Sequence, residues 1–107
     1  MVVDYAVMTK VLEKKGDTLT AQVKYAAMKA ALESALNARR DGKSTMDVNG
    51  IAYKAAQATI PVVYEQLTTG KTVSEHDTKE LAAWDWAKDA LEILPKYDAE
   101  QKLAQGG

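Results

Sequence analysis

Residues 19–40 read LTAQVKYAAMKAALESALNARR and place apolar side chains on two sides of an expected helix. One stripe at helical spacing holds large residues, namely Tyr25, Met28, Leu32 and Leu36. A second stripe holds small residues, namely Val23, Ala27, Ala30, Ala31 and Ala38. Small side chains let the backbone of a neighbouring helix approach closely. We therefore predict a central helix that packs against neighbours on both of these sides.

Glycine junctions divide the rest of the chain into segments of helical length. They lie at Gly16, Gly42 and Gly70, where a glycine suited to the left-handed C′ position precedes a candidate N-cap residue. Pro95 marks a fourth boundary. The predicted helices span 3–15, 19–40, 46–68, 75–93 and 98–104, and Pro61 is expected to kink or split the third. Because short connections favour antiparallel neighbours, the sequence predicts an all-α, up-and-down bundle of four main helices plus a short C-terminal helix.

Length and composition restrict the chain to one small domain. Residues 1–105 of the 107 are expected to fold as a single helical unit, and 106–107 to form a flexible C-terminal end. The net charge of −1 argues against disorder, although large aliphatic residues are few. The absence of cysteine excludes a disulfide scaffold and a thiolate metal site. Neither a membrane-spanning apolar run nor a signal peptide is found, so a cytoplasmic location is expected.

The predicted helix over 75–93 has large apolar residues on opposite sides. Trp84 lies in a core-facing stripe, whereas Trp86 and Ile93 point about 160° away from it at 100° per residue. Asp85 and Asp89 form part of an acidic stripe. Two explanations for the second apolar side stay open. Either the C-terminal helix folds back over it, or another molecule covers it, since tryptophan is enriched at interface hot spots.

Motifs for catalysis and cofactor binding are incomplete. The strings Gly42-Lys43-Ser44 and Gly70-Lys71-Thr72 lack the earlier glycine that a phosphate-binding loop requires. His76 and Glu80 share a helical face, but two ligands do not make a metal site, and carboxylates near a helix start are explained by the helix dipole. We therefore predict no catalytic, cofactor-binding or metal-binding residues, no cofactor, no small-molecule substrate and no enzymatic activity.

Charge is distributed unevenly along the chain. Residues 1–74 carry 10 basic and 7 acidic side chains, a net charge of +3, whereas residues 75–100 carry 3 basic and 8 acidic, a net charge of −5. Pairing within the chain and docking of a partner on the acidic face both explain this asymmetry. Arg39, Arg40 and Lys43 form the main basic cluster, which supports an alternative function as a small nucleic-acid-binding regulator.

The function predicted from these features is that of a non-catalytic helical interaction or assembly subunit. Its expected partner is another protein or a second copy of the chain, rather than nucleic acid or a membrane. The predicted contact residues are Trp86, Ile93, Asp85 and Asp89.

Overall fold

The computed structural model describes residues 4–12, 16, 18–82 and 86–104, with residues 82 and 86–91 described by their backbone only. Its helices, in chain order, are α1 (Tyr5–Val11), α2 (Leu19–Arg40), α3 (Thr45–Leu67), α4 (Glu75–Ala82) and α5 (Trp86–Ala104). All regular structure in the described part is helical, which confirms the predicted all-α class. The short helices are α1 and α4, whereas the C-terminal helix is long.

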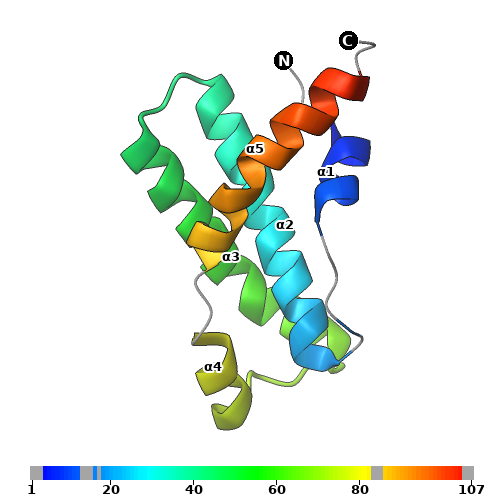
Figure 1. Ribbon diagram of the computed structural model, residues 1–107. Coiled ribbons are helices and arrows are strands. Elements are labelled where there is room, and N and C mark those ends of the chain that lie inside the picture. Colours follow the sequence, from blue (N-terminus) through cyan, green and yellow to red (C-terminus); the bar gives the residue numbers. More distant parts are fainter. Residues whose placement is uncertain (1–3, 13–15, 17, 83–85, 105–107) are drawn as a thin grey trace.

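The centre of the fold is an antiparallel pair formed by α2 and α3 (Figure 1). The helix α5 lies across this pair and contacts both of its members, and α1 packs against α5. The helix α4 lies at the other end of the pair, where it contacts α2. The predicted packing of α2 against neighbours on more than one side is therefore confirmed.

Local capping explains where the central helices begin and end. Thr18 accepts a hydrogen bond from the backbone N–H of Ala21, and Ser44 accepts one from that of Asp47. These side chains occupy the predicted N-cap positions and satisfy N–H groups that the helix itself cannot. At the end of α2, the backbone N–H of Lys43 donates a hydrogen bond to the carbonyl of Ala38 at 3.0 Å. The turn between them contains Gly42, whose φ is +81°. This is the left-handed turn predicted for that junction.

Replacing the turn glycines is expected to destabilise the protein. Gly42→Ala and Gly70→Ala should each lower the free energy of unfolding by about 1 kcal/mol, because φ values of +81° and +97° disfavour a residue with a Cβ. Apart from the adjacent residues, no atom lies within 4 Å of the place that a Cβ would take at either glycine, so the expected loss is conformational and not steric. Urea titration followed by circular dichroism measures it. An unchanged unfolding midpoint in both variants would contradict the assignment of these two glycines to left-handed turns.

The core is built on alanines that bring α2 and α3 together. Ala27, Ala31 and Ala35 of α2 and Ala52 and Ala56 of α3 are completely buried. Larger buried side chains belong to the same core, and these include Met8, Val23, Leu32, Leu36, Ile93 and Tyr97. Because alanine has no side-chain torsion to lose, the close α2–α3 contact forms at little cost in side-chain entropy.

The helix boundary predicted at Pro95 is wrong, and the split considered at Pro61 does not occur. The helix α3 runs through Pro61 without a split, and α5 runs through Pro95, so residues 98–104 continue α5 and form no separate helix. A proline inside a helix removes one hydrogen bond and costs about 3 kcal/mol. Burial offsets this cost at α5, since Ile93 and Tyr97 on either side of Pro95 are both buried in the core. The predicted single helix over 75–93 is replaced by α4 and α5.

The helix α1 is attached to the C-terminal part of the chain. The backbone N–H of Asp4 donates to the Tyr97 hydroxyl at 2.9 Å, and Lys10 Nζ lies 3.2 Å from a carboxylate oxygen of Glu100. The Tyr5 hydroxyl donates to Glu33 of α2 at 2.7 Å, and this bond raises the pKa of Tyr5 above its ordinary value. These contacts join α1 to both α5 and α2.

Candidate functional site

Of the four contact residues predicted from the sequence, Ile93 is the one whose side chain lies in the described part of the structure. Ile93 is 9% exposed and belongs to the hydrophobic core, so helices of the same chain cover its side chain. The physical reason is that α5 contacts α1, α2 and α3, which leaves the side of Ile93 facing the core. Trp86 and Asp89 lie on α5 with side chains outside the described part, and Asp85 lies outside the described residues altogether.

The basic cluster at the α2–α3 junction is largely paired with carboxylates. The guanidinium of Arg39 donates to both carboxylate oxygens of Asp98, at 3.0 and 2.7 Å. Arg40 Nε lies 3.3 Å from Asp41 Oδ1. Lys43 is exposed beside them. A bidentate carboxylate partner satisfies the donors that a phosphate group would use, which reduces the electrostatic attraction of this cluster for nucleic acid.

Ion pairs between helices account for part of the charge asymmetry. Three of them, Lys10–Glu100, Lys24–Glu80 and Arg39–Asp98, each join a base in residues 1–74 to an acid in residues 75–100. These ion pairs therefore support the explanation that the two oppositely charged parts of the sequence pair within the chain.

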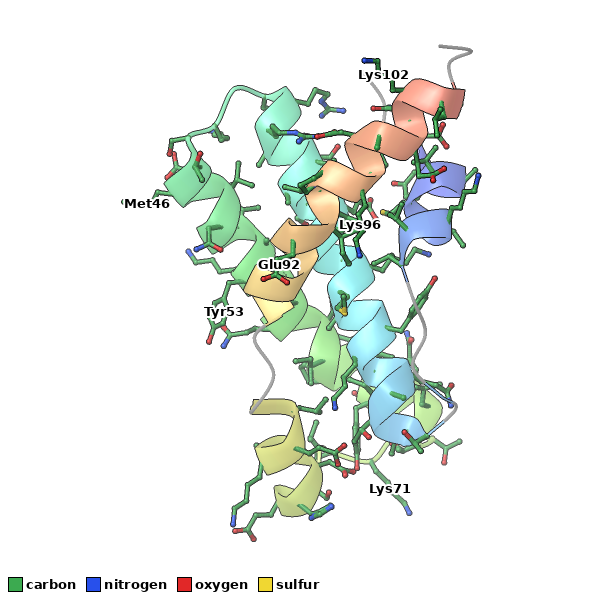
Figure 2. The ribbon with its side chains drawn as sticks, viewed as in Figure 1. Met46, Tyr53, Lys71, Glu92, Lys96 and Lys102 are labelled. Carbon is green, nitrogen blue, oxygen red and sulfur yellow. The ribbon has the colours of Figure 1, made fainter. Side chains whose placement is uncertain are left out.

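Exposed apolar side chains are concentrated on α3. In the described part of the chain, seven large hydrophobic residues are exposed, and five of them lie on this helix: Met46, Ile51, Tyr53, Val62 and Leu67. Figure 2 shows Met46 and Tyr53 pointing away from α2. We call the exposed part of α3 its outer side. The contact residues predicted from the sequence do not include this surface, although the apolar residues between positions 46 and 68 cover more than about a third of the helix circumference at 100° per residue.

A shallow pocket of about 370 Å³ lies at the start of this outer side. Its lining residues are Lys43, Met46, Asp47, Gly50, Ile51 and Lys54. Apolar groups form part of its wall, and two ammonium groups and one carboxylate surround them. An apolar side chain flanked by polar groups suits this combination better than a small polar metabolite does.

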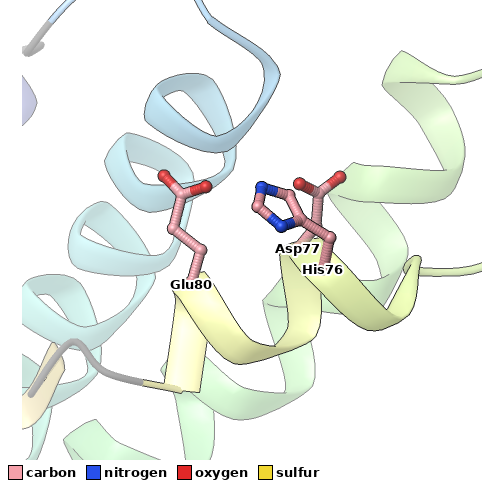
Figure 3. Close-up of side chains that lie close together, drawn as sticks. All are labelled: His76, Asp77 and Glu80. Atoms are coloured by element: carbon pink, nitrogen blue, oxygen red, sulfur yellow. The ribbon is translucent and has the colours of Figure 1, made fainter.

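A second candidate site lies on α4. One ligand atom each from His76, Asp77 and Glu80 lies within 4.8 Å of the others, and the three side chains project from the same side of the helix (Figure 3). Glu80 lies one helical turn after both of its neighbours, at spacings of four and three residues. The sequence spacing identified His76 and Glu80 as a pair. It did not place Asp77 with them.

The two carboxylates of this cluster are held by other helices. Tyr64 of α3 donates from its hydroxyl to Asp77 Oδ2 at 2.6 Å. Thr20 of α2 donates to Glu80 Oε1 at 3.0 Å, and Lys24 Nζ lies 3.7 Å from the same oxygen. The cluster is therefore part of the contact by which α4 is attached to α2 and α3.

Comparison with protein-family models, with curated proteins and with solved structures gives no match for this chain. None of the described helices is both long and apolar enough to cross a membrane.

Proposed function

We propose that the protein is a non-catalytic helical interaction subunit, which binds another protein chain through the outer side of α3. The observation that supports this function is the concentration of exposed apolar residues on that one helix. Scattered exposed apolar residues are normal on a protein surface. Met46 and Ile51, however, line one pocket at the start of α3, and together they form an apolar patch of the kind that proteins use for association. The partner is a helix of a second copy or of a different protein.

Gly50 supports the same surface. It lies inside α3, it is exposed, and beyond its own helical backbone no atom comes within 4 Å of where its Cβ would be. Glycine inside a helix is about 1 kcal/mol less favourable than alanine, and contacts within the described chain do not require it. A partner whose backbone approaches α3 closely at the pocket would require it, as small residues do at close helix contacts.

The first variant tests the apolar patch. Met46 is 83% exposed, so Met46→Lys should change the free energy of unfolding by less than about 0.5 kcal/mol. It should weaken association by at least about tenfold, because a charge would be buried in an apolar contact. Leu103→Lys on α5 is the matched control, since Leu103 is 68% exposed and lies outside the patch. Light scattering after gel filtration measures the mass over a range of concentrations.

Gly50→Ala tests the same surface, and it should change stability and association in opposite directions. It should raise the free energy of unfolding by about 1 kcal/mol, and it should weaken association because the new methyl group occupies the approach to the pocket. If the wild-type chain is monomeric, the same variants are compared for the partner that each retains from its source cells. The proposal is wrong if neither mass nor partner retention differs between Met46→Lys and Leu103→Lys.

Nucleic-acid binding through Arg39, Arg40 and Lys43 is the alternative function. Two of these three residues have carboxylate partners in the structure, so no observation on the described residues favours it over protein binding. A shift of duplex DNA that weakens steeply with added salt would support this alternative, because phosphate contacts release counterions.

A further inference from the structure

The cluster of His76, Asp77 and Glu80 has the composition of a transition-metal site. It offers one imidazole nitrogen and two carboxylates, and these donor types are the ones that Zn²⁺ uses when no thiolate is available. An imidazole ligand favours ions of this class over Ca²⁺ and Mg²⁺, which prefer oxygen donors only. The chain contains a single histidine and no cysteine, so no other nitrogen or sulfur ligand of this strength competes with His76.

Hydrogen bonds from other helices orient both carboxylates of the cluster through one oxygen each. Tyr64 donates to Oδ2 of Asp77, and Thr20 donates to Oε1 of Glu80, to which Lys24 is also closest. Each of these hydrogen bonds uses one carboxylate oxygen, so the second oxygens, Asp77 Oδ1 and Glu80 Oε2, are the ones that we assign to the metal ion. A ligand carboxylate held by a second partner through its other oxygen is the usual arrangement around protein-bound metals.

The side chains can close around an ion with small movements. Zinc–ligand distances of about 2.0–2.2 Å put tetrahedral ligand atoms about 3.4 Å apart. The three donor atoms lie within 4.8 Å of one another. His76 is exposed, so its side chain can turn toward the two carboxylates without disturbing the core. Asp77, which is half-buried and held by Tyr64, would be the fixed point of the site.

We propose that His76, Asp77 and Glu80 bind one divalent transition-metal ion of the Zn²⁺ class, with water completing its coordination. Two charges oppose this binding, namely the positive end of the α4 dipole and the ammonium of Lys24. The dipole amounts to about half a unit charge, which is smaller than the two negative charges of Asp77 and Glu80. Lys24 lies 3.7 Å from Glu80 and is the cation that the metal ion has to displace or share.

The experiment titrates the full chain with ZnCl₂ by calorimetry, and with CoCl₂ by absorption spectroscopy. We expect one ion per chain and a visible Co²⁺ spectrum of low coordination number. His76→Ala should lower the affinity for Zn²⁺ by at least about 100-fold, since it removes a direct ligand. Glu75→Gln is the matched control, because Glu75 is an exposed carboxylate on the same helix outside the cluster, and it should leave the affinity within about twofold.

Two further variants test how the site is positioned. Tyr64→Phe keeps the buried ring but removes its hydrogen bond to Asp77, and it should weaken Zn²⁺ binding about 10-fold, the lower limit for loss of such a partner. It should also shift the Co²⁺ spectrum, which a change in stability alone would not do. Lys24→Gln should strengthen Zn²⁺ binding, because it removes the competing cation.

Three results would overturn the proposal. The first is no saturable binding of Zn²⁺ up to about 1 mM, roughly the weakest affinity at which a site is meaningful. The second is an affinity that His76→Ala leaves unchanged. The third is Ca²⁺ binding as strong as Zn²⁺ binding, which would assign the cluster to general attraction by carboxylates. None of these measurements depends on association through α3, so the two proposals succeed or fail separately.

Discussion

Leu32→Ala is expected to lower the free energy of unfolding by about 2–5 kcal/mol, the usual range for a buried leucine. Leu32 is 0% exposed and lies in the middle of α2, the helix that contacts α3, α4 and α5. We expect the upper part of this range, because the buried neighbours Ala27, Ala31 and Ala35 have no side-chain torsions with which to fill the cavity. A loss of this size is a large fraction of the roughly 5–15 kcal/mol that stabilises a typical domain.

Chemical denaturation followed by circular dichroism measures this change. Lys29→Ala, three residues earlier and exposed, is the control on the same helix and should stay within about 0.5 kcal/mol of the wild type. A loss below about 1 kcal/mol for Leu32→Ala, outside the range for such substitutions, would show that the central contact is looser than the structure indicates.

Ile93→Ala is expected to destabilise the folded chain by a similar amount, about 2–5 kcal/mol. Ile93 is buried against the core formed with α1, α2 and α3, so the substitution leaves a cavity inside the molecule. The self-association of the remaining folded protein should not change, in contrast to Met46→Lys. Leu103→Ala, on the exposed end of α5, is the matched control for stability. If Ile93→Ala instead reduces association and leaves stability intact, the side of Ile93 is an interface after all.

The sequence predicts the central part of this fold well because local rules determine it. The bounds of α2 and its Thr18 cap agree with the prediction, since a capping side chain and a turn glycine lie on either side of one amphipathic segment. The same rules fail at Pro95, where the local cost of proline is offset by the burial of Ile93 and Tyr97. That burial depends on helices distant in sequence, which helical periodicity does not reveal.

For the candidate sites, too, local sequence patterns do not reveal contacts between helices that are distant in sequence. Helical spacing brings His76 and Glu80 to one face, and the structure confirms that they lie close together. The orientation of Asp77 depends on Tyr64, which comes from the preceding helix, so no local pattern indicates it. The interpretation of the second apolar side of residues 75–93 assumes one continuous helix with one buried side, whereas the structure describes two helices, α4 and α5. The helix α5 contacts α1, α2 and α3, and these contacts between distant parts of the chain bury Ile93.

The attachment of α1 to α5 has a consequence for the order of folding. Helices shorter than about 12–15 residues are marginal in isolation, and α1 has 7 residues. Its hydrogen bond from Asp4 to Tyr97 spans 93 positions of sequence, whereas α2 and α3 are joined by a short turn. Because loop closure must precede such distant contacts, the α2–α3 hairpin is expected to form early and α1 to dock last. In the native protein, the backbone amides of α1 should accordingly exchange with deuterium sooner than those of the buried middle of α2.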